Sequence, residues 1–492
     1  MKSGISPESL QRILSIGVAL TAERNMNRLL DTILTETMAI TGCDAGTLYL
    51  LEDGRLHFKI MRNRTLGIFR GGTGDPIDLP PVDIAESYVA AYVVIHRRME
   101  NIPDVYHSDK FDFSGTKRYD ALTGYRCRSM MVIPLMNSRG EAVGSLQLIN
   151  AMDENGEVVP FSPAYEEVFR SISSQAAIAV DNMRYNEENK ALFQSVVEVL
   201  AAAIDERSHY NANHTRQVVE LTRGFVAFLN EKYTEGRTAI HFSPEEIEQL
   251  VMAAWLHDIG KIITPLEIMD KATRLGGGEA MLELRFEAIL AAERVRLLEG
   301  AATQREFDEL AAELAGVREL CFRVNTGAPT TEEEMALLRG FGERTCVTPS
   351  GVVLRWLETE EIECLAIRVG TLTPAERRVM EKHVEITCRL LGKIRFSSEY
   401  RDVPTFASDH HEKLNGHGYP AGKAGGELPA GTRILTVMDV FEALTARDRP
   451  YKKPIPLGRA FEILDDMAGA GELDVEIVGW LKEWEKWEES WV

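Results

Sequence analysis

The chain of 492 residues is too long for a single compact core, and its length predicts roughly two to four domains. Its formal charge of −21 and pI of about 5.1 argue against broad electrostatic binding to nucleic acid polymers or anionic membranes. The sequence contains no apolar run long enough to cross a bilayer, so we expect no membrane insertion and a cytoplasmic protein. The six cysteines are widely scattered without CxxC spacing, which indicates reduced thiols.

The N-terminal part of the chain has the pattern of one mixed domain. Residues 1–24 form a weakly amphipathic segment and are expected to be helical. Residues 25–183 then begin with the helix-periodic stretch LLDTILTETMAI and continue with the short apolar runs AGTLYLL, SMMVIPLM and AVGSLQLIN. This order predicts an α/β module with a mostly antiparallel sheet and flanking helices. A long helix closes the module, and its residues 184–207 form a linker.

Three stretches of this module carry a family signal: ENIPDVY at 100–106, LTGYRCRSMMVIPL at 122–135 and GSLQLIN at 144–150. Together they resemble a GAF domain over residues 25–183, which implies a sensor. The cyclic-nucleotide subgroup carries a spaced Asn, Lys, Phe, Asp, Glu signature, which Asn150, Phe161 and Glu166 match. Ala151 replaces the Lys and Tyr165 replaces the Asp. The ligand therefore stays open between a cyclic nucleotide, another small molecule and none, with the domain serving as a dimerisation module.

The linker helix contains a short heptad seam formed by Leu192, Val196, Val199 and Ala203. Such a seam can pair two chains, and we expect a homodimer through the GAF domain and the linker helix. Packing of the seam on the chain's own domain is the alternative.

Five histidines and two aspartates that follow the linker helix have the composition of a metal site. Each lies on a predicted helix or at its end: His214, His257, Asp258, His383, His410, His411 and Asp439. Mixed imidazole and carboxylate ligands suit iron or manganese, and zinc less well. Adjacent helical residues point about 100° apart and rarely serve one ion. Such neighbours can serve either a pair of ions or one ion and its edge, and in a pair of ions Asp258 is the natural bridging carboxylate.

These residues belong to a series of six motifs in chain order: His214 itself, HDIGK at 257–261, EKHVEIT around His383, HHEKLNGHGYP at 410–420, LTVMDVFEALT around Asp439 and the following RPYK at 449–452. These motifs resemble the HD-GYP family over residues 208–275 and 371–470. The resemblance implies an all-α, metal-dependent phosphodiesterase of the HD superfamily that hydrolyses cyclic dinucleotides. By position it assigns His214, His257, Asp258 and Asp439 to one ion, and Asp258, His383, His410 and His411 to the other.

Further roles follow from the same resemblance. Lys261 matches a catalytic lysine near the scissile phosphate, where a cation offsets developing negative charge. Arg449 and Lys452 match positions that hold the substrate phosphate, and Gly418 and Tyr419 belong to a loop of the pocket wall. His417 matches no family ligand and is expected off the metals. Some relatives bind a third ion through a Glu at the position of Tyr210, so two ions are expected here.

Residues 276–370 interrupt the resemblance and form an insertion. Two helix-periodic runs predict a helical hairpin, continued by TTEEEMALLRGF and the shorter run VVLRWLETEE. The insertion could cover the mouth of the active site or contact another subunit, and a tolerated surface excursion is the alternative. In the C-terminal helix, 471–492, Trp480, Trp484, Trp487 and Trp491 share one stripe and are expected to dock on the protein's own body.

The sequence as a whole predicts a multidomain α+β protein in which a GAF sensor is joined by a long helix to an all-α HD-GYP domain. The implied activity is hydrolysis of a cyclic dinucleotide, chiefly cyclic di-GMP, to a linear dinucleotide or GMP by a metal-bridging hydroxide under control of the GAF domain. Two alternatives stay open, a cyclic GMP-AMP phosphodiesterase and a catalytically quiet cyclic-dinucleotide receptor.

Overall fold

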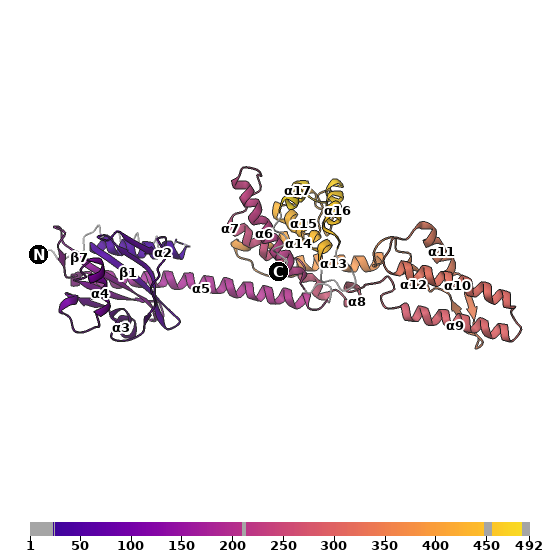
Figure 1. Cartoon of the computed structure of the whole chain (residues 1–492), viewed down its shortest axis with the longest axis horizontal. Coiled ribbons are helices and arrows are strands. Elements are labelled where there is room, and N and C mark those ends of the chain that lie inside the picture. Colours follow the sequence, from indigo (N-terminus) through magenta and orange to yellow (C-terminus); the bar gives the residue numbers. More distant parts are fainter. Residues whose placement is uncertain (1–22, 24, 209–212, 447–454, 485–492) are drawn as a thin grey trace. The chain divides into compact units, whose positions relative to one another are not determined.

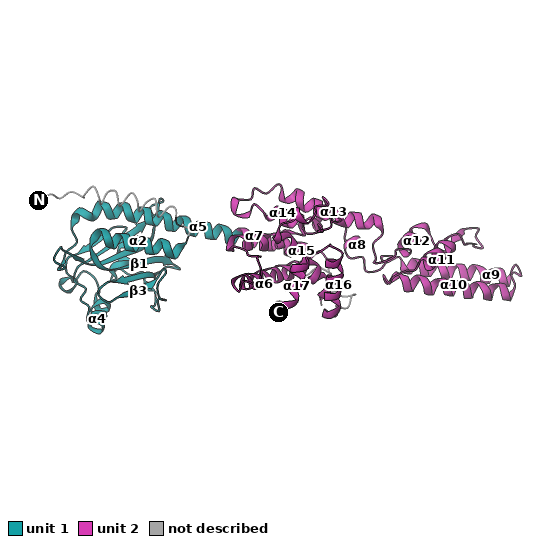
Figure 2. Ribbon diagram, turned by 90° about the horizontal axis from the view of Figure 1, so that it is seen from above, with its two compact units in different colours: residues 1–192 teal, residues 193–492 magenta. Residues whose placement is uncertain are grey.

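A computed structural model describes residues 23, 25–208, 213–446 and 455–484. The chain divides into two compact units, residues 1–192 and 193–492 (Figure 2). Helix α5 (Glu166–Asp205) begins in the first unit and ends in the second. The helix predicted over residues 1–24 lies outside the described residues, except for residue 23.

The first unit is built around one antiparallel sheet with the strand order β3-β2-β1-β7-β6-β5. Two short strands pair at its margins, β4 with β2 and β8 with β7. The strands are β1 (Cys43–Glu52), β2 (Arg55–Asn63), β3 (Ile68–Gly71), β4 (Val82–Asp83), β5 (Glu100–Ile102), β6 (Met130–Met136), β7 (Ala142–Met152) and β8 (Val158–Val159).

Helices cover both faces of this sheet (Figures 1 and 2). Helix α2 (Met26–Thr41) and the first part of α5 bury one face, together with Leu48 and Leu50 of β1. Helix α3 (Val89–His96) packs on the opposite face with Tyr49, and α4 (Ser114–Thr123) follows in the chain. Alternate residues of β1 thus enter two separate cores, as the period of a strand requires. The predicted α/β module with a mostly antiparallel sheet is confirmed.

The second unit is helical around the predicted metal ligands. Most of its helices share one apolar core that includes Phe225, Leu250 and Met438. The helices outside the insertion are α6 (His214–Thr234), α7 (Pro244–Leu256), α8 (Leu266–Met269), α13 (Pro374–Leu391), α14 (Val403–Ser408), α15 (Ala430–Thr445), α16 (Leu457–Gly469) and α17 (Val475–Glu483), with a 3₁₀ turn η3 (Ile259–Ile263) between α7 and α8. Capping boxes at Ser243 and Thr373 begin α7 and α13, two of the elements that position the metal ligands.

The insertion forms its own apolar core. Its elements are α9 (Glu279–Leu298), α10 (Gln304–Asn325), α11 (Glu332–Gly342), β9 (Thr345–Val347), β10 (Val353–Arg355) and α12 (Thr359–Leu365). The predicted α9–α10 pair is present, but the expectation that the run VVLRWLETEE simply continues the helices is wrong at Val353–Arg355, which pairs with β9. The physical reason is a turn at Gly351, where φ is 82°, followed by two β-branched valines.

The root of the insertion is closed by a buried arginine. Arg274 is 0% exposed, and its guanidinium donates to the carbonyls of Gly370, Leu365 and Ala328. These bonds tie the segment that leads from α8 into the insertion to the segment that leads back to α13. The two segments that join the insertion to α8 and α13 are therefore held together by hydrogen bonds at its root.

The C-terminal tryptophans dock on the protein's own body as far as the structure describes them. The Trp484 ring lies 5.6 Å from that of Phe225, and the Trp480 ring lies 6.2 Å from that of Phe228, both on α6. Trp487 and Trp491 lie outside the described residues.

The predicted heptad seam on α5 faces solvent. Leu192 is 64% exposed, Val196 48% and Val199 68%, while Val197 on the opposite face is buried in the core of the second unit. The seam does not pack on the part of the chain that the structure describes, so the alternative of self-packing is wrong there. Exposed apolar side chains at heptad spacing are available to a second chain.

Candidate metal centre

The second unit brings all seven predicted ligands together from five places in the chain. His214 is the first residue of α6, and His257 and Asp258 follow α7. His383 lies within α13, His410 and His411 follow α14, and Asp439 lies on α15. Two groups of three ligand atoms, each within 4.8 Å of one another, are formed by His214, His257 and Asp258 and by His383, His410 and His411.

The first group is centred on Nε2 of His214. This atom lies 3.3 Å from His257 Nε2 and 3.4 Å from Asp258 Oδ2. Asp439 joins the group, with its Oδ1 atom 3.3 Å from the same nitrogen. Two imidazoles and two carboxylates therefore face one buried space.

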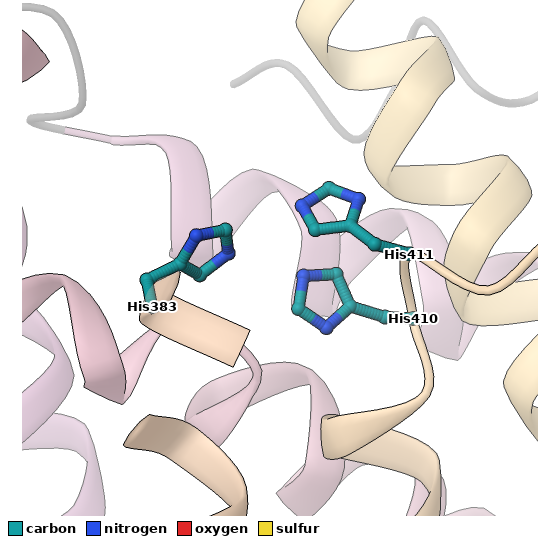
Figure 3. A group of neighbouring side chains, drawn as sticks. All are labelled: His383, His410 and His411. Atoms are coloured by element: carbon teal, nitrogen blue, oxygen red, sulfur yellow. The ribbon is translucent and has the colours of Figure 1, made fainter. Parts of the chain in front are cut away.

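The second group consists of three histidine rings (Figure 3). Ring centroids are 4.1 Å apart for His410 and His411, and 5.2 Å for His383 and His411. Asp258 lies between the groups, because its Oδ1 atom is 3.3 Å from His383 Nε2 while its Oδ2 atom faces the first group. One carboxylate with an oxygen toward each group has the arrangement of a bridging ligand.

A close approach of two backbones places Asp258 beside His383. A Cβ atom at Gly260 would lie 1.9 Å from the carbonyl oxygen of His383, so only glycine permits η3 to pack on α13 at this distance. Thr387 completes the contact, since its hydroxyl accepts from Gly260 N and donates to the carbonyl of His257. The HDIG sequence therefore serves the packing as well as the ligand set.

Hydrogen bonds at the far nitrogen set the tautomer of three rings. Nδ1–H of His257, His383 and His410 donates to the backbone carbonyl three residues earlier, at 2.7, 2.6 and 2.7 Å. These bonds assign the proton of each ring to Nδ1. Each Nε2 atom therefore carries a free lone pair that points toward the other predicted ligands. Metal-binding histidines are held in this way.

Several of these lone pairs have no partner of their own. Within the described residues, Nε2 of His383, Nε2 of His410 and Oδ1 of Asp258 are buried without a hydrogen-bond partner. Buried acceptors that face one another are costly unless a cation lies between them. The residues present therefore fit transition-metal ions, which imidazole and carboxylate bind well.

The electrostatics of the first group favour positive charge. Burial by itself would lower the pKa of His214, but the carboxylates of Glu442, Asp258 and Asp439 outweigh it and raise that pKa well above its ordinary value. Burial would also raise the pKa of Asp258, yet Lys261, His257 and His214 hold it well below its usual range. A bound cation would supply the charge that the carboxylates favour and would displace the competing proton.

Burial favours the neutral form of the three histidines in the second group. Burial lowers the pKa of His410 well below its ordinary value, with a further contribution from the adjacent His411. Burial likewise lowers the pKa of His411 to about 4 and that of His383 below its ordinary value. Neutral imidazole is the form that binds a metal, so no proton competes here near pH 7.

Lys261 belongs to the same cluster. Its Nζ atom lies 2.5 Å from Asp258 Oδ2, and its side chain is mostly buried. Burial would lower the pKa of Lys261, but Asp258 and Asp439 raise it, so the ammonium stays charged. The structure thus places a fixed cation beside the carboxylate that joins the two groups.

The Gly-Tyr-Pro loop packs against the second group. The Tyr419 ring lies 4.9 Å from that of His411, and Tyr419 N donates to the His411 carbonyl. A Cβ atom at Gly418 would lie 2.4 Å from Glu412 Cα, so glycine is required for this approach. His417 is exposed and belongs to neither group.

Sequence reasoning missed two buried carboxylates. Glu412 accepts from the backbone nitrogens of Ala421, Gly422 and Lys423 and so fixes the loop after Pro420. Glu442 accepts from Nδ1 of His214. The sequence offered a signal for each of them. Glu412 directly follows His410 and His411, and Glu442 lies three residues after Asp439. Arg449, Lys452 and Tyr210 lie outside the described residues.

In the first unit, Asn150 of the cyclic-nucleotide signature is engaged by the fold. Its Oδ1 atom accepts from the backbone nitrogens of Arg128 and Ser129, and its Nδ2 atom donates to Tyr125 Oη. Phe161 is buried in the core between the sheet and α5. Two of the matching positions therefore have structural roles.

Comparison with known families identifies both units. A family model of the GAF domain matches residues 25–180, and a family model of the HD domain matches residues 360–477. The chain carries a GAF domain followed by an HD domain. Motifs of the HD-GYP type lie on both sides of the insertion, and the HD-domain match begins inside it, at residue 360.

Similar proteins match the chain only in part. Over 97 residues it is 39% identical to 3'3'-cGAMP-specific phosphodiesterase 3 of Vibrio cholerae, covering 20% of each chain. Over 105 residues it is 36% identical to the cyclic di-GMP phosphodiesterase of Thermotoga maritima, covering 21% of this chain and 28% of that one. Over 175 residues it is 33% identical to dual 3',5'-cyclic-AMP and -GMP phosphodiesterase 11 of Drosophila melanogaster, covering 34% and 11%. The chain therefore spans less than a third of the length of these relatives.

None of the described helices of the GAF and HD domains is both long and apolar enough to cross a membrane.

Proposed function

We propose that the HD domain is a phosphodiesterase that hydrolyses a cyclic dinucleotide, chiefly cyclic di-GMP, with two transition-metal ions. The single observation that carries the proposal is Asp258, which directs one oxygen toward each of two buried ligand groups. Iron is the preferred metal, with manganese as the alternative, because the ligands are imidazoles and carboxylates without a thiolate.

The ligand assignment follows the two groups. His214, His257, Asp258 and Asp439 would hold one ion, and Asp258, His383, His410 and His411 the other. When bound, the ions would supply an activated water at neutral pH and a Lewis acid for the phosphate oxygens.

The protein's own residues would orient the substrate and stabilise charge. The Lys261 ammonium, held charged beside Asp258, would offset negative charge as it develops on the phosphate. Arg449 and Lys452 would hold substrate phosphate oxygens, with Arg449 able to contact two at once. Gly418 and Tyr419 would form the wall of the pocket beside His411. The product would be a linear dinucleotide, or GMP if both ester bonds are cut.

A second substrate is supported by one observation. The 3'3'-cGAMP-specific enzyme of Vibrio cholerae is 39% identical over its matched segment, against 36% for the cyclic di-GMP enzyme of Thermotoga maritima. Cyclic GMP-AMP is therefore the alternative substrate. A catalytically quiet receptor would bind either dinucleotide without turnover.

The GAF domain and helix α5 would regulate this activity. The protein would act in the cytoplasm. The GAF domain would bind a cyclic nucleotide or another small ligand and control hydrolysis through α5. The exposed seam of Leu192, Val196 and Val199 would pair two chains into a homodimer.

The test is a turnover assay on anaerobically purified full-length protein with both dinucleotides, together with metal analysis of the same sample. We expect two ions per chain and hydrolysis with a preference for cyclic di-GMP. His257→Ala and Asp258→Ala should each lose bound metal and activity. Metal loss with unchanged hydrolysis would exclude the enzymatic proposal, and tight binding without turnover would establish the receptor.

A further inference from the structure

One histidine of the metal centre is supported differently from three others. His214 donates from Nδ1 to the carboxylate of Glu442, and both side chains are buried, at 5% and 1% exposed. Glu442 lies three residues after Asp439 on α15, a spacing that puts both carboxylates on the same side of the helix. Helix α15 thus contributes to the first group twice, once directly and once through His214.

The other three rings with an assigned Nδ1 bond donate to neutral backbone carbonyls, at Ala254, Met380 and Ala407. A hydrogen bond to a carboxylate is roughly twice as strong as one between neutral groups. A carboxylate behind an imidazole also raises the basicity of the opposite nitrogen. Nε2 of His214 is therefore the most electron-rich of these four nitrogens.

The distribution of carboxylates adds to this difference. Both groups share Asp258, but the first group also contains Asp439, whose Oδ1 atom lies 3.3 Å from His214 Nε2. The second group consists otherwise of three histidines. Lys261 pairs with Oδ2 of Asp258, the oxygen directed at the first group, but Asp439 remains a carboxylate that only the first group contains. A divalent cation is attracted more strongly to the first group.

We propose that Glu442 is a positioning residue that makes the two halves of the metal centre unequal. By holding His214 with Nε2 toward the first group, it causes this half to bind a divalent transition-metal ion first and more tightly than the half formed by His383, His410 and His411. This inference rests on the proposed two-ion centre and specifies the order in which it fills.

The test is a titration of metal-free, full-length protein with Co²⁺ alone, followed by visible absorption and by metal analysis. We expect two steps, with the first dissociation constant about tenfold or more below the second. Glu442→Gln should weaken the first step about 10- to 100-fold and leave the second nearly unchanged. His214→Ala should remove the tight step, whereas His383→Ala should remove the weak one.

Two further variants separate this role from a loss of folding. Glu442→Asp keeps the charge and shortens the side chain, so it should weaken the same first step by less than Glu442→Gln. It serves as the test if the glutamine variant fails to fold. Glu293→Gln removes a buried carboxylate of the insertion that pairs with Arg296, and both steps should stay at wild-type affinity. Circular dichroism verifies the fold of each variant.

The outcomes distinguish the two proposals. Two equal steps in the wild-type protein, or a first step that neither Glu442 variant weakens, would overturn the inference while leaving the two-ion centre in place. A wild-type chain that binds fewer than two ions would instead overturn the proposed function.

Discussion

His383 Nε2 lies 3.3 Å from Asp258 Oδ1, and within the described residues neither buried atom has a hydrogen-bond partner. The proton of His383 is on Nδ1, where it donates to Met380, so two acceptors face each other. The contact links α13 to the start of η3. A cation between them would turn a repulsive contact into a stabilising one.

Metal removal should therefore destabilise the HD domain. Protein stripped with a chelator should unfold at a lower temperature than protein saturated with Mn²⁺, because an ion at a thousand times its dissociation constant adds about 4 kcal/mol to the stability of the folded state. Thermal unfolding followed by circular dichroism measures the shift. Asp258→Ala should show a much smaller shift, and an equal shift in that variant would place the ions elsewhere.

Gly260→Ala should damage the centre without altering any ligand. Its Cβ atom would lie 1.9 Å from the His383 carbonyl, so η3 and α13 must separate, at a cost of about 1–3 kcal/mol. Separation moves Asp258 away from His383, and metal analysis should show loss of one ion. Gly426→Ala is the matched control, because a Cβ atom there has no neighbour within 4 Å among the described residues. Equal metal content in both variants would contradict the prediction.

The ion pair at the root of the insertion should depend on pH. Lys271 Nζ lies 2.8 Å from both carboxylate oxygens of Glu376. Burial by itself would raise the pKa of Glu376, but Lys271 and Thr373 outweigh it and lower that pKa below its ordinary 4.5. The stabilisation is thus fully present above pH 4.5 and is lost as the pH falls through the lowered value.

Glu376→Gln should accordingly cost about 1 kcal/mol at pH 7, and the difference from wild type should shrink near pH 3. Urea unfolding at both pH values measures it. Glu385→Gln, at an exposed position of the same helix, should have little effect at either pH. If the wild-type protein keeps the same excess free energy of unfolding over Glu376→Gln at pH 3, the ion pair is not the source of that excess.

The exposed seam of α5 should determine the oligomeric state. Leu192→Glu combined with Val199→Glu places charges where two chains would meet, and we expect a dimer to become a monomer with its thermal stability retained. Light scattering coupled to size-exclusion chromatography gives the mass. Glu187→Lys, at another exposed position of α5, should remain dimeric. A dimer that survives the double substitution must be formed by other surfaces.

Local patterns in the sequence determined most of the fold. Alternating apolar runs specified β1, β6 and β7, because strand side chains alternate between two faces. The motifs also placed all seven predicted ligands in one cluster, although their metal roles stay a prediction. Turns were harder to predict from the sequence, and the hairpin of β9 and β10 was not predicted.

Only the tertiary structure decided which partners those side chains have. Glu442 contacts His214 across 228 positions of chain, and no periodicity or spacing connects residues so far apart. The exposure of Leu192 and Val199 was undecided for a similar reason, since a heptad seam looks the same whether it packs on its own domain or faces solvent. Sequence patterns record short-range geometry, whereas these contacts depend on how separate helices pack.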